Sequence, residues 1–200
     1  KPLDQYLQET IFDPLGMTDT AFQVGADKVD RFTANYQRGP DKGLKLIDDP
    51  ASSAFAKPPG FLSGGGGLTG ASADYMRFAE MLRRGGELDG QRIIGPRTLE
   101  MMHMNHLPGG KDLTQLALGT FSETANEGVG FGLGFASTQG QVETATLGVG
   151  DYYWGGAAST IFWVDPKEDL SVVFMTQLMP SGTFNFRGQL KNLIYSAIVD

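Results

Sequence analysis

The feature of this sequence that most constrains its fold is a run of small residues, 155–159, that follows the aromatic segment Tyr152–Trp154. A β-branched and aromatic segment, 159–164, comes next, and a second apolar segment, 170–177, follows after a short polar loop. This pattern predicts an antiparallel β-hairpin. Because glycine inside a strand often marks the close approach of a ligand or of another backbone, this strand edge is predicted to form one wall of an active site.

Apolar residues recur with the spacing of an amphipathic helix in four other parts of the sequence. Pro14 disfavours a helical conformation at Asp13, so the segment Phe12–Met17 is expected to end the first of these helices. Gly85 and Gly86 should stop the second helix, and Pro96 should open the third. The apolar periodicity of the four predicted helices covers residues 3–11, 75–82, 96–102 and 190–198.

The order of the remaining segments indicates the fold class. Residues 20–59 are irregular and rich in proline, glycine and aspartate, and so long a loop in a compact domain is often functional. From Val129 onward the residue pattern predicts β-strands, beginning with a glycine-interrupted strand at 131–135. The predicted order is helices and loops, then strands, then one helix. This order favours an α+β fold over an alternating βαβ fold. We predict a single domain, with residues 1–128 as its helical and loop region and 129–200 as antiparallel strands plus a C-terminal helix.

The composition is that of an ordinary globular domain, with 40% apolar and 20% charged residues. The net charge of -7 argues against nucleic acid and against an anionic membrane surface as partners. The absence of cysteine excludes disulfides, a thiol nucleophile and a cysteine-type zinc site. No apolar run approaches the roughly 18 residues of a transmembrane segment. Nothing resembles a signal peptide, and Lys1 is interpreted as an internal cut or a processed end, which leaves a cytoplasmic and a periplasmic location both open.

The sequence contains none of the motifs that usually carry a catalytic serine. No serine is followed three residues later by lysine. There is also no Gly-x-Ser-x-Gly elbow, no Lys-Thr-Gly or Lys-Ser-Gly, and no Tyr-x-Asn. The nucleophile is therefore unknown, and none is assigned within this chain.

Two other clusters have both a functional and a simpler interpretation. His103 and His106 would share one face of a helix, but no glutamate of a zinc-enzyme pattern accompanies them. A surface or loop role is favoured over a metal site, and no metal or other cofactor is predicted. The four glycines at 64–67 could form an anion-binding nest before a helix, but no lysine follows as in a nucleotide-binding loop. A tight turn is favoured here.

Four blocks of the sequence, in order, resemble the serine β-lactamase-like superfamily. They are most similar to the class C β-lactamase-related carboxylesterases, transesterases and D-aminopeptidases. The first and fourth blocks are the most specific, and together the blocks cover most of the chain. The blocks are Ile11–Phe22, Gly64–Leu68 with Asp74–Leu82, Gly85–Pro96, and Trp154–Gly156 with Phe162–Pro166.

This resemblance implies a β-lactamase/transpeptidase-like fold, here incomplete, and assigns roles to a few residues. The family's third active-site motif is Lys, His or Trp, then any residue, then Gly, on the strand that lines the cleft. Residues 154–156 occupy this place. The backbone N–H of Ala157, further along the strand, would be one oxyanion donor, and the N–H of the serine nucleophile the other. The implied substrate-binding residues are Trp154, Gly155 and Gly156, with Gly65 and Gly66 on the opposite rim.

The family's Ser-x-x-Lys and Tyr motifs normally precede the block at 11–22, so the resemblance implies the C-terminal part of such an enzyme, with those motifs upstream of Lys1. The implied activity is that of a serine hydrolase of esterase type, working through an acyl-enzyme. The substrate would be a small-molecule ester or amide. Trp154 in place of a lysine favours neutral esters, since a cation there would pair with a substrate carboxylate. This chain alone would be inactive.

Two alternatives stay open. One is a β-lactamase or DD-peptidase that acts on carboxylate-bearing amides, and the other is a non-catalytic β-lactamase-like binding module. In either case the sheet would be incomplete without the family's N-terminal strands, which leaves a strand edge and an apolar face open. We therefore expect a complementing N-terminal chain or a homo-oligomer.

Overall fold

A computed structural model describes residues 1–116, 127–144 and 146–199 of the chain. Residues 117–126, which belong to the predicted region 1–128, lie outside the described residues. None of the described helices combines the length and the apolar character that crossing a membrane requires. The α-helices are α1 (Leu3–Leu7), α2 (Asp13–Leu15), α3 (Ser72–Arg83), α4 (Pro96–His103), α5 (Leu113–Leu116), α6 (Gln141–Thr144) and α7 (Phe186–Tyr195). The strands are β1 (Asn35–Arg38), β2 (Leu44–Asp48), β3 (Glu87–Leu88), β4 (Gln91–Arg92), β5 (Val129–Phe131), β6 (Ala136–Thr138), β7 (Tyr152–Gly155), β8 (Ile161–Asp165), β9 (Leu170–Phe174) and β10 (Leu178–Met179).

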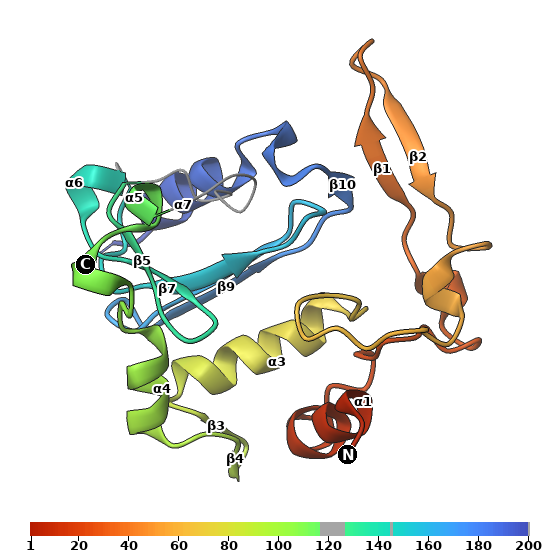
Figure 1. Cartoon of the computed structure of the whole chain (residues 1–200), viewed down its shortest axis with the longest axis horizontal. Coiled ribbons are helices and arrows are strands. Elements are labelled where there is room, and N and C mark those ends of the chain that lie inside the picture. The colour runs from red at the N-terminus through yellow and green to blue at the C-terminus, as the bar shows by residue number, and fades with distance from the viewer. Residues whose placement is uncertain (117–126, 145, 200) are drawn as a thin grey trace.

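The largest sheet is an antiparallel meander of five strands in the order β5-β6-β7-β8-β9. Figure 1 shows α3 on one side of this sheet and α7 on the other. Helix α3 packs directly against β8 and β9, so the helical and the strand regions of the sequence share one core. An antiparallel sheet with helices from outside it on both faces confirms the predicted α+β class.

Two apolar clusters fill the two faces of this sheet. The cluster toward α3 contains the predicted helix residues Ala79 and Leu82 together with Phe162 and Val164. The cluster toward α7 contains Trp163. Successive residues of β8 thus point to opposite faces, as the strand period of two requires, and all five of its residues are buried.

The predicted hairpin of β8 and β9 is present, with slightly different ends. Its register runs from Ile161 opposite Phe174 to Asp165 opposite Leu170. The first strand begins at Ile161 rather than at Ser159 because Ser159 has a φ of 68°. This left-handed conformation is incompatible with a strand.

The single strand predicted at 131–135 was wrong, since β5 ends at Phe131 and residues 132–135 form a turn before β6. The Gly132 N–H donates to the Phe135 carbonyl at 2.8 Å, and Gly134 has a φ of 103°. The glycines therefore close a hairpin rather than interrupt one strand, because positive φ carries no steric cost for glycine.

The first helix ends within the predicted segment 12–17, but Asp13 and Pro14 are themselves helical. A π-helical segment, Gln8–Phe12, joins α1 to α2, and the Asp13 N–H donates to the carbonyl five residues before it. This wider turn accommodates a proline, which lacks an N–H and clashes with the carbonyl four residues back in a regular α-helix. Gly16, with a φ of 64°, ends the helix.

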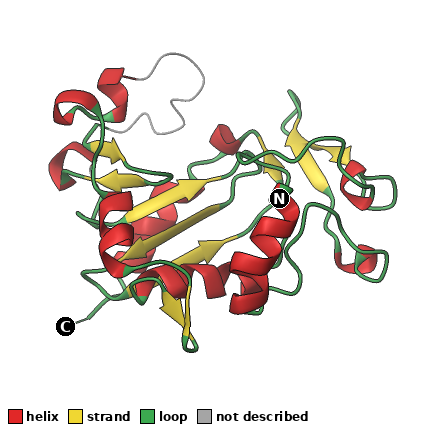
Figure 2. Cartoon of the chain, turned by 60° about the horizontal axis from the view of Figure 1, so that its bottom comes forward, coloured by secondary structure: helices red, strands yellow, loops and turns green. Residues whose placement is uncertain are grey.

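The segment 20–59, predicted to be irregular, contains part of a second sheet. Strands β1 and β2 form an antiparallel hairpin, and β10 pairs in parallel with β1, with Tyr36 opposite Leu178. The hairpin stands apart from the five-stranded sheet (Figures 1 and 2). Its strands are four and five residues long, which is too short for periodicity to stand out between glycine, proline and aspartate.

The first turn of α3 holds the segment that follows α2. Asp74 is buried, and its carboxylate accepts hydrogen bonds from the Asp19 N–H at 2.7 Å and the Thr20 hydroxyl at 2.9 Å. One turn later, Arg77 donates to the Leu15 carbonyl. These bonds attach the N-terminal segment to the helix that packs on the sheet.

The helices predicted at 96–102 and 190–198 are present as α4 and α7. Helix α7 begins before the predicted range, at Phe186, because the Asn185 side chain caps it. The cap accepts a hydrogen bond from the Gly188 N–H at 3.1 Å.

Polar side chains on one face of α7 attach it to one end of the β7–β8 pair, where Tyr152 lies opposite Val164. Lys191 Nζ lies 2.5 Å from Asp151 Oδ2, directly before β7. The Tyr195 hydroxyl donates to Asp165, at the end of β8, at 2.6 Å. All four residues are buried, and we call them the α7 anchor. Burial raises the pKa of Asp151, an effect that the Lys191 ammonium and the Thr138 hydroxyl oppose.

Replacing Lys191 with methionine should destabilise the fold, because it leaves the Asp151 carboxylate buried without its cation. Breaking a buried ion pair in this way typically lowers the free energy of unfolding by about 3–5 kcal/mol. Asp151→Asn in the same background should recover most of the loss, since a neutral amide can still accept from the Thr138 hydroxyl. Urea denaturation measures both variants. A loss below about 1 kcal/mol for Lys191→Met would contradict the stabilising role of the pair.

Candidate functional site

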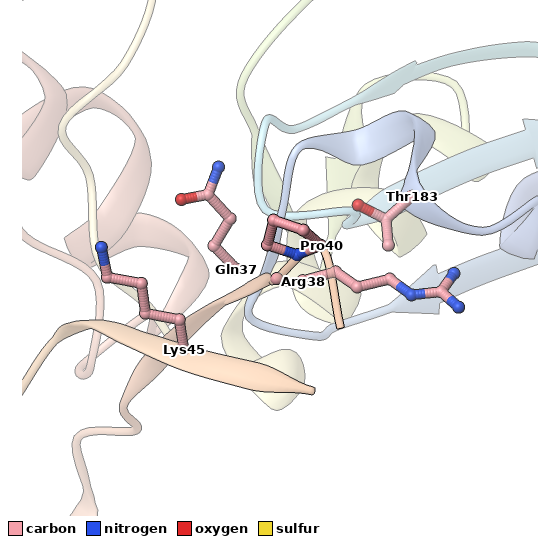
Figure 3. Close-up of a pocket in the computed structure, with 6 residues that line it drawn as sticks. Gln37, Arg38, Pro40, Lys45 and Thr183 are labelled. Carbon is pink, nitrogen blue, oxygen red and sulfur yellow. The ribbon is translucent and has the colours of Figure 1, made fainter. Parts of the chain in front are cut away.

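One cavity, of about 560 Å³, lies between the β1–β2 hairpin and Thr183. In Figure 3 the charged ends of Arg38 and Lys45 point away from each other. Arg38 is instead directed toward Phe184, with its Cζ 4.8 Å from the ring centroid. The polar side chains drawn there do not converge on one point, as they do in most ligand sites, so this cavity is a poor candidate for chemistry.

A smaller cavity, about 140 Å³, lies where α3 meets the end of β7. The structure brings Trp154, Gly155 and Gly156 together along this cavity, and all three were predicted to bind substrate. Helix α3, strand β8 and the segment after β9 supply the remaining walls. Those lining residues are Tyr75, Thr160, Ile161, Phe162 and Met175. We call this the β7 cavity, and it is the candidate site.

Aromatic pairs shape the walls of the β7 cavity. The Tyr75 ring lies 5.2 Å from that of Phe162, and Trp154 meets Phe131 edge to face at 5.2 Å. Burial raises the pKa of Tyr75 to about 12, so its phenol is neutral at physiological pH. The described lining residues carry no charge, which suits the cavity to a neutral ligand.

A tight turn, residues 156–160, connects β7 to β8 at the mouth of this cavity. The Gly156 N–H donates to the Thr160 carbonyl at 3.0 Å, and the Ser159 N–H donates to the Gly156 carbonyl at 3.1 Å. The Ser159 hydroxyl donates to the Leu178 carbonyl at 2.6 Å. We call this segment the β7–β8 turn. Its hydrogen bonds fix its backbone from both within and outside the turn.

Ala157 lies in the β7–β8 turn and not on a strand as predicted, because β7 ends at Gly155. The small residues that follow Gly155 lack the β-branched and aromatic side chains that favour strands. Ala157 is exposed, and within the described residues no group accepts a hydrogen bond from its N–H. This donor is therefore available to the carbonyl oxygen of a ligand.

Gly65 and Gly66, predicted for the opposite rim, lie elsewhere. Both are exposed, and neither is among the described residues that line the β7 cavity. The Gly65 N–H donates to the Ser63 hydroxyl at 3.1 Å, and Ser63 pairs with Gly66. In this structure the glycines form a local turn, as in the simpler of the two sequence interpretations.

The two histidines lie in separate settings. The His103 ring stacks on Tyr152, with centroids 4.4 Å apart and planes 4° from parallel, and burial lowers its pKa. His106 Nε2 lies 2.8 Å from the Met101 carbonyl oxygen. No cluster of three potential metal ligands occurs in the described part of the chain. His103 thus packs against β7, rather than occupying the predicted surface or loop position.

Ser159 is the serine of the β7–β8 turn, and its setting does not suit a nucleophile. A catalytic serine presents its hydroxyl to the substrate and shares its proton with a base. Ser159 is buried, and its hydroxyl donates to a backbone carbonyl. Its role here is to hold the turn.

Sequence reasoning missed five of the described cavity residues: Tyr75, Thr160, Ile161, Phe162 and Met175. The helical periodicity predicts that Tyr75 faces the interior, but not which strand lies opposite. Thr160 and Met175 follow the small-residue run and β9 respectively, and no local signal marks either as a lining residue. The cavity arises from the packing of α3 on the sheet, which a local pattern does not reveal.

Comparisons with known proteins agree with this fold. A family model described as Beta-lactamase matches residues 1–195. Protein Rv1367c of Mycobacterium tuberculosis (strain H37Rv) is 32% identical over 183 residues, which are 90% of this chain and 44% of that protein. Acyltransferase calJ of Penicillium decumbens is 23% identical over 188 residues, which again are 90% of this chain and 44% of that protein. Among solved structures, EstCE1, described as a hydrolase with promiscuous acyltransferase activity, matches with a TM-score of 0.77 and 25% identity. This match covers 98% of the present chain and 51% of EstCE1.

These matches confirm the resemblance and the β-lactamase/transpeptidase-like fold that the four sequence blocks predict. The chain spans about half the length of the relatives that it matches. That coverage fits the expectation that it corresponds to one portion of a longer protein of this kind.

Proposed function

Because the chain belongs to the beta-lactamase family, we propose that it supplies one wall of the active site of an esterase-type serine hydrolase or acyltransferase. In this proposal the serine nucleophile, with the lysine and tyrosine that manage its proton, comes from the part of the protein outside this chain. The serine oxygen attacks the carbonyl carbon of a small ester or amide. The alcohol or amine leaves with a proton, and the resulting acyl-enzyme is resolved by water or by a second acceptor.

The observation that carries this proposal is the exposed Ala157 N–H beside an uncharged cavity. Negative charge builds on the carbonyl oxygen during acyl transfer, and a backbone N–H fixed in advance stabilises that charge by ~3 kcal/mol. The hydrogen bonds of Gly156 and Ser159 hold the turn on both sides of Ala157. The donor therefore needs little reorganisation during the reaction. Trp154 and Tyr75 would enclose the acyl or alcohol group of the substrate.

The lining of the β7 cavity supports neutral esters over the substrates of a β-lactamase or DD-peptidase. Trp154 stands where a cation would pair with a substrate carboxylate, and the other described lining residues are also uncharged. The descriptions of EstCE1 as a hydrolase with promiscuous acyltransferase activity and of calJ as an acyltransferase favour an enzyme over a non-catalytic module. These two descriptions also support either water or an alcohol as the acceptor of the acyl group.

The full-length protein that contains this chain should hydrolyse a short p-nitrophenyl ester in preference to a chromogenic cephalosporin. We expect kcat/KM to differ by ~10²-fold or more, because an unpaired carboxylate in an apolar cavity costs several kcal/mol. Initial rates on both substrates measure the ratio. The opposite preference would favour a β-lactamase or DD-peptidase, and turnover of neither substrate would favour a binding module.

Ala157→Pro in the full-length protein removes the proposed oxyanion donor. We expect kcat on the ester to fall by ~10²-fold or more, the usual effect of losing one such donor, with little change in KM. Ala157→Ser keeps the N–H and is the matched control, which should retain most of the activity. Melting temperatures establish that both variants fold. A folded Ala157→Pro variant with undiminished turnover would show that this N–H is not part of the oxyanion site.

We also propose that β9 pairs with a segment outside this chain. Strand β9 is an edge of the five-stranded sheet and consists of Leu170, Ser171, Val172, Val173 and Phe174. An apolar edge strand offers unpaired N–H and C=O groups to another strand. The length of the relatives supports an N-terminal segment of the same protein as the partner, with a second copy of this chain as the alternative.

The isolated chain should not react with a fluorophosphonate probe, because no nucleophile has been identified in it. Co-expression with the rest of the protein should give a co-purifying complex that the probe labels at a serine of the other segment. Stoichiometric labelling within this chain would contradict the proposed origin of the nucleophile. Light scattering of the isolated chain provides a second check, since a well-behaved monomer at high concentration would argue against an open sheet edge.

A further inference from the structure

We propose that Arg187 is a positioning residue that holds the β7–β8 turn, and with it the Ala157 N–H, in the orientation that acyl transfer requires. The inference rests on the proposed function and extends it to a residue outside the cavity. Arg187 lies in the first turn of α7, on the opposite face of the sheet from α3. It would act on the reaction only through the backbone of the turn.

The contacts of Arg187 bridge the two ends of the turn. Its Nη2 donates to the Gly156 carbonyl at 3.0 Å and lies 3.3 Å from the Thr160 carbonyl oxygen, which it also bonds. Gly156 opens the turn and Thr160 closes it, and the Gly156 N–H is itself bonded to the Thr160 carbonyl. One guanidinium nitrogen thus joins both ends of the segment that presents Ala157.

Gly155 makes this contact possible. A Cβ on Gly155 would lie within 3.0 Å of the Nη2, Cζ and Nε atoms of Arg187, so any side chain there would displace the guanidinium. Glycine in a strand indicates a close approach. At this position the approaching group is a side chain from α7, which gives Gly155 a role distinct from the ligand contact predicted from the sequence.

The helix dipole does not explain why Arg187 lies in the first turn of α7. A cation in the first turn faces the positive end of the helix dipole, which is unfavourable. Two backbone carbonyls at hydrogen-bond distance account for its position instead. Arginine suits this geometry better than lysine, because its planar fork holds several donors in a fixed arrangement. Arg187 also shares a helix face with Lys191 and Tyr195, four and eight residues later, so the α7 anchor fixes the helix that carries it.

The test compares Arg187→Lys and Gly155→Ala in the full-length protein. Arg187→Lys keeps the positive charge but loses the planar guanidinium. Gly155→Ala keeps Arg187, but the new Cβ occupies the space of the guanidinium. Both should speed hydrogen exchange of the backbone amides at 156–160. Both should lower kcat on the ester by as much as ~10²-fold, the scale of a displaced reacting group, with KM nearly unchanged. The double variant should lose little more than either single variant, since both changes break the same contact.

Tyr195→Phe is the matched control. It removes one hydrogen bond of the α7 anchor but leaves the Lys191–Asp151 pair and the contacts of Arg187 in place, so it should lower the melting temperature without changing exchange at 156–160 or kcat. Unaltered exchange at 156–160 in a folded Arg187→Lys or Gly155→Ala variant would overturn the inference, whatever the activity. An Arg187→Lys variant with full kcat would also overturn it when Ala157→Pro is inactive. Full activity of Ala157→Pro would instead contradict the proposed function, so failure of the two proposals can be told apart.

Discussion

The buried ion pair between Lys191 and Asp151 joins α7 to the large sheet, and the first turn of the same helix contacts the β7–β8 turn at the candidate site. Two charges removed from water are tolerated only when their geometry is good and their remaining hydrogen bonds are satisfied. Asp151 meets this condition through the Thr138 hydroxyl, and the Tyr195–Asp165 bond secures the next turn of the helix. The first turn of the same helix holds Arg187 against Gly155, and its guanidinium bonds both ends of the β7–β8 turn. Under the proposal for Arg187, polar contacts in the core therefore help to fix the conformation of this turn.

Backbone and side chains have different roles in the candidate site. Aromatic side chains such as Tyr75 and Trp154 line the cavity, while the proposed oxyanion donor is a peptide N–H. A backbone donor cannot be lost by substitution of its side chain, except by proline. This explains why a segment of small and chemically plain residues can be a wall of an active site. The requirement is for space around the N–H, which glycine and alanine provide.

The parts of the fold that follow from local pattern could be predicted from the sequence. The periodicity of α3 and the two segments of the β8–β9 hairpin fall in this group, and the family blocks indicated the overall architecture. The differences have local physical causes: the turn between β5 and β6 depends on a positive φ at Gly134 that residue types do not reveal, and Asp13 is helical before a proline because a π-helical segment precedes it. Arg187 escaped notice because nothing near it in the sequence connects it with Gly155. Its contact exists only after α7 packs on the sheet.

The order of strands in the large sheet also bears on how the molecule folds. Strands β5 to β9 pair with their neighbours in sequence, so each pairing closes a short loop at a small entropic cost. The parallel pairing of β1 with β10 joins Tyr36 to Leu178 across most of the chain, and such non-local contacts form late. Leu178 is also the residue whose carbonyl accepts the Ser159 hydroxyl. The β1–β2 hairpin is thus joined to the same short segment that holds the turn carrying Ala157, so a region far away in the sequence is linked to the candidate site through a single residue.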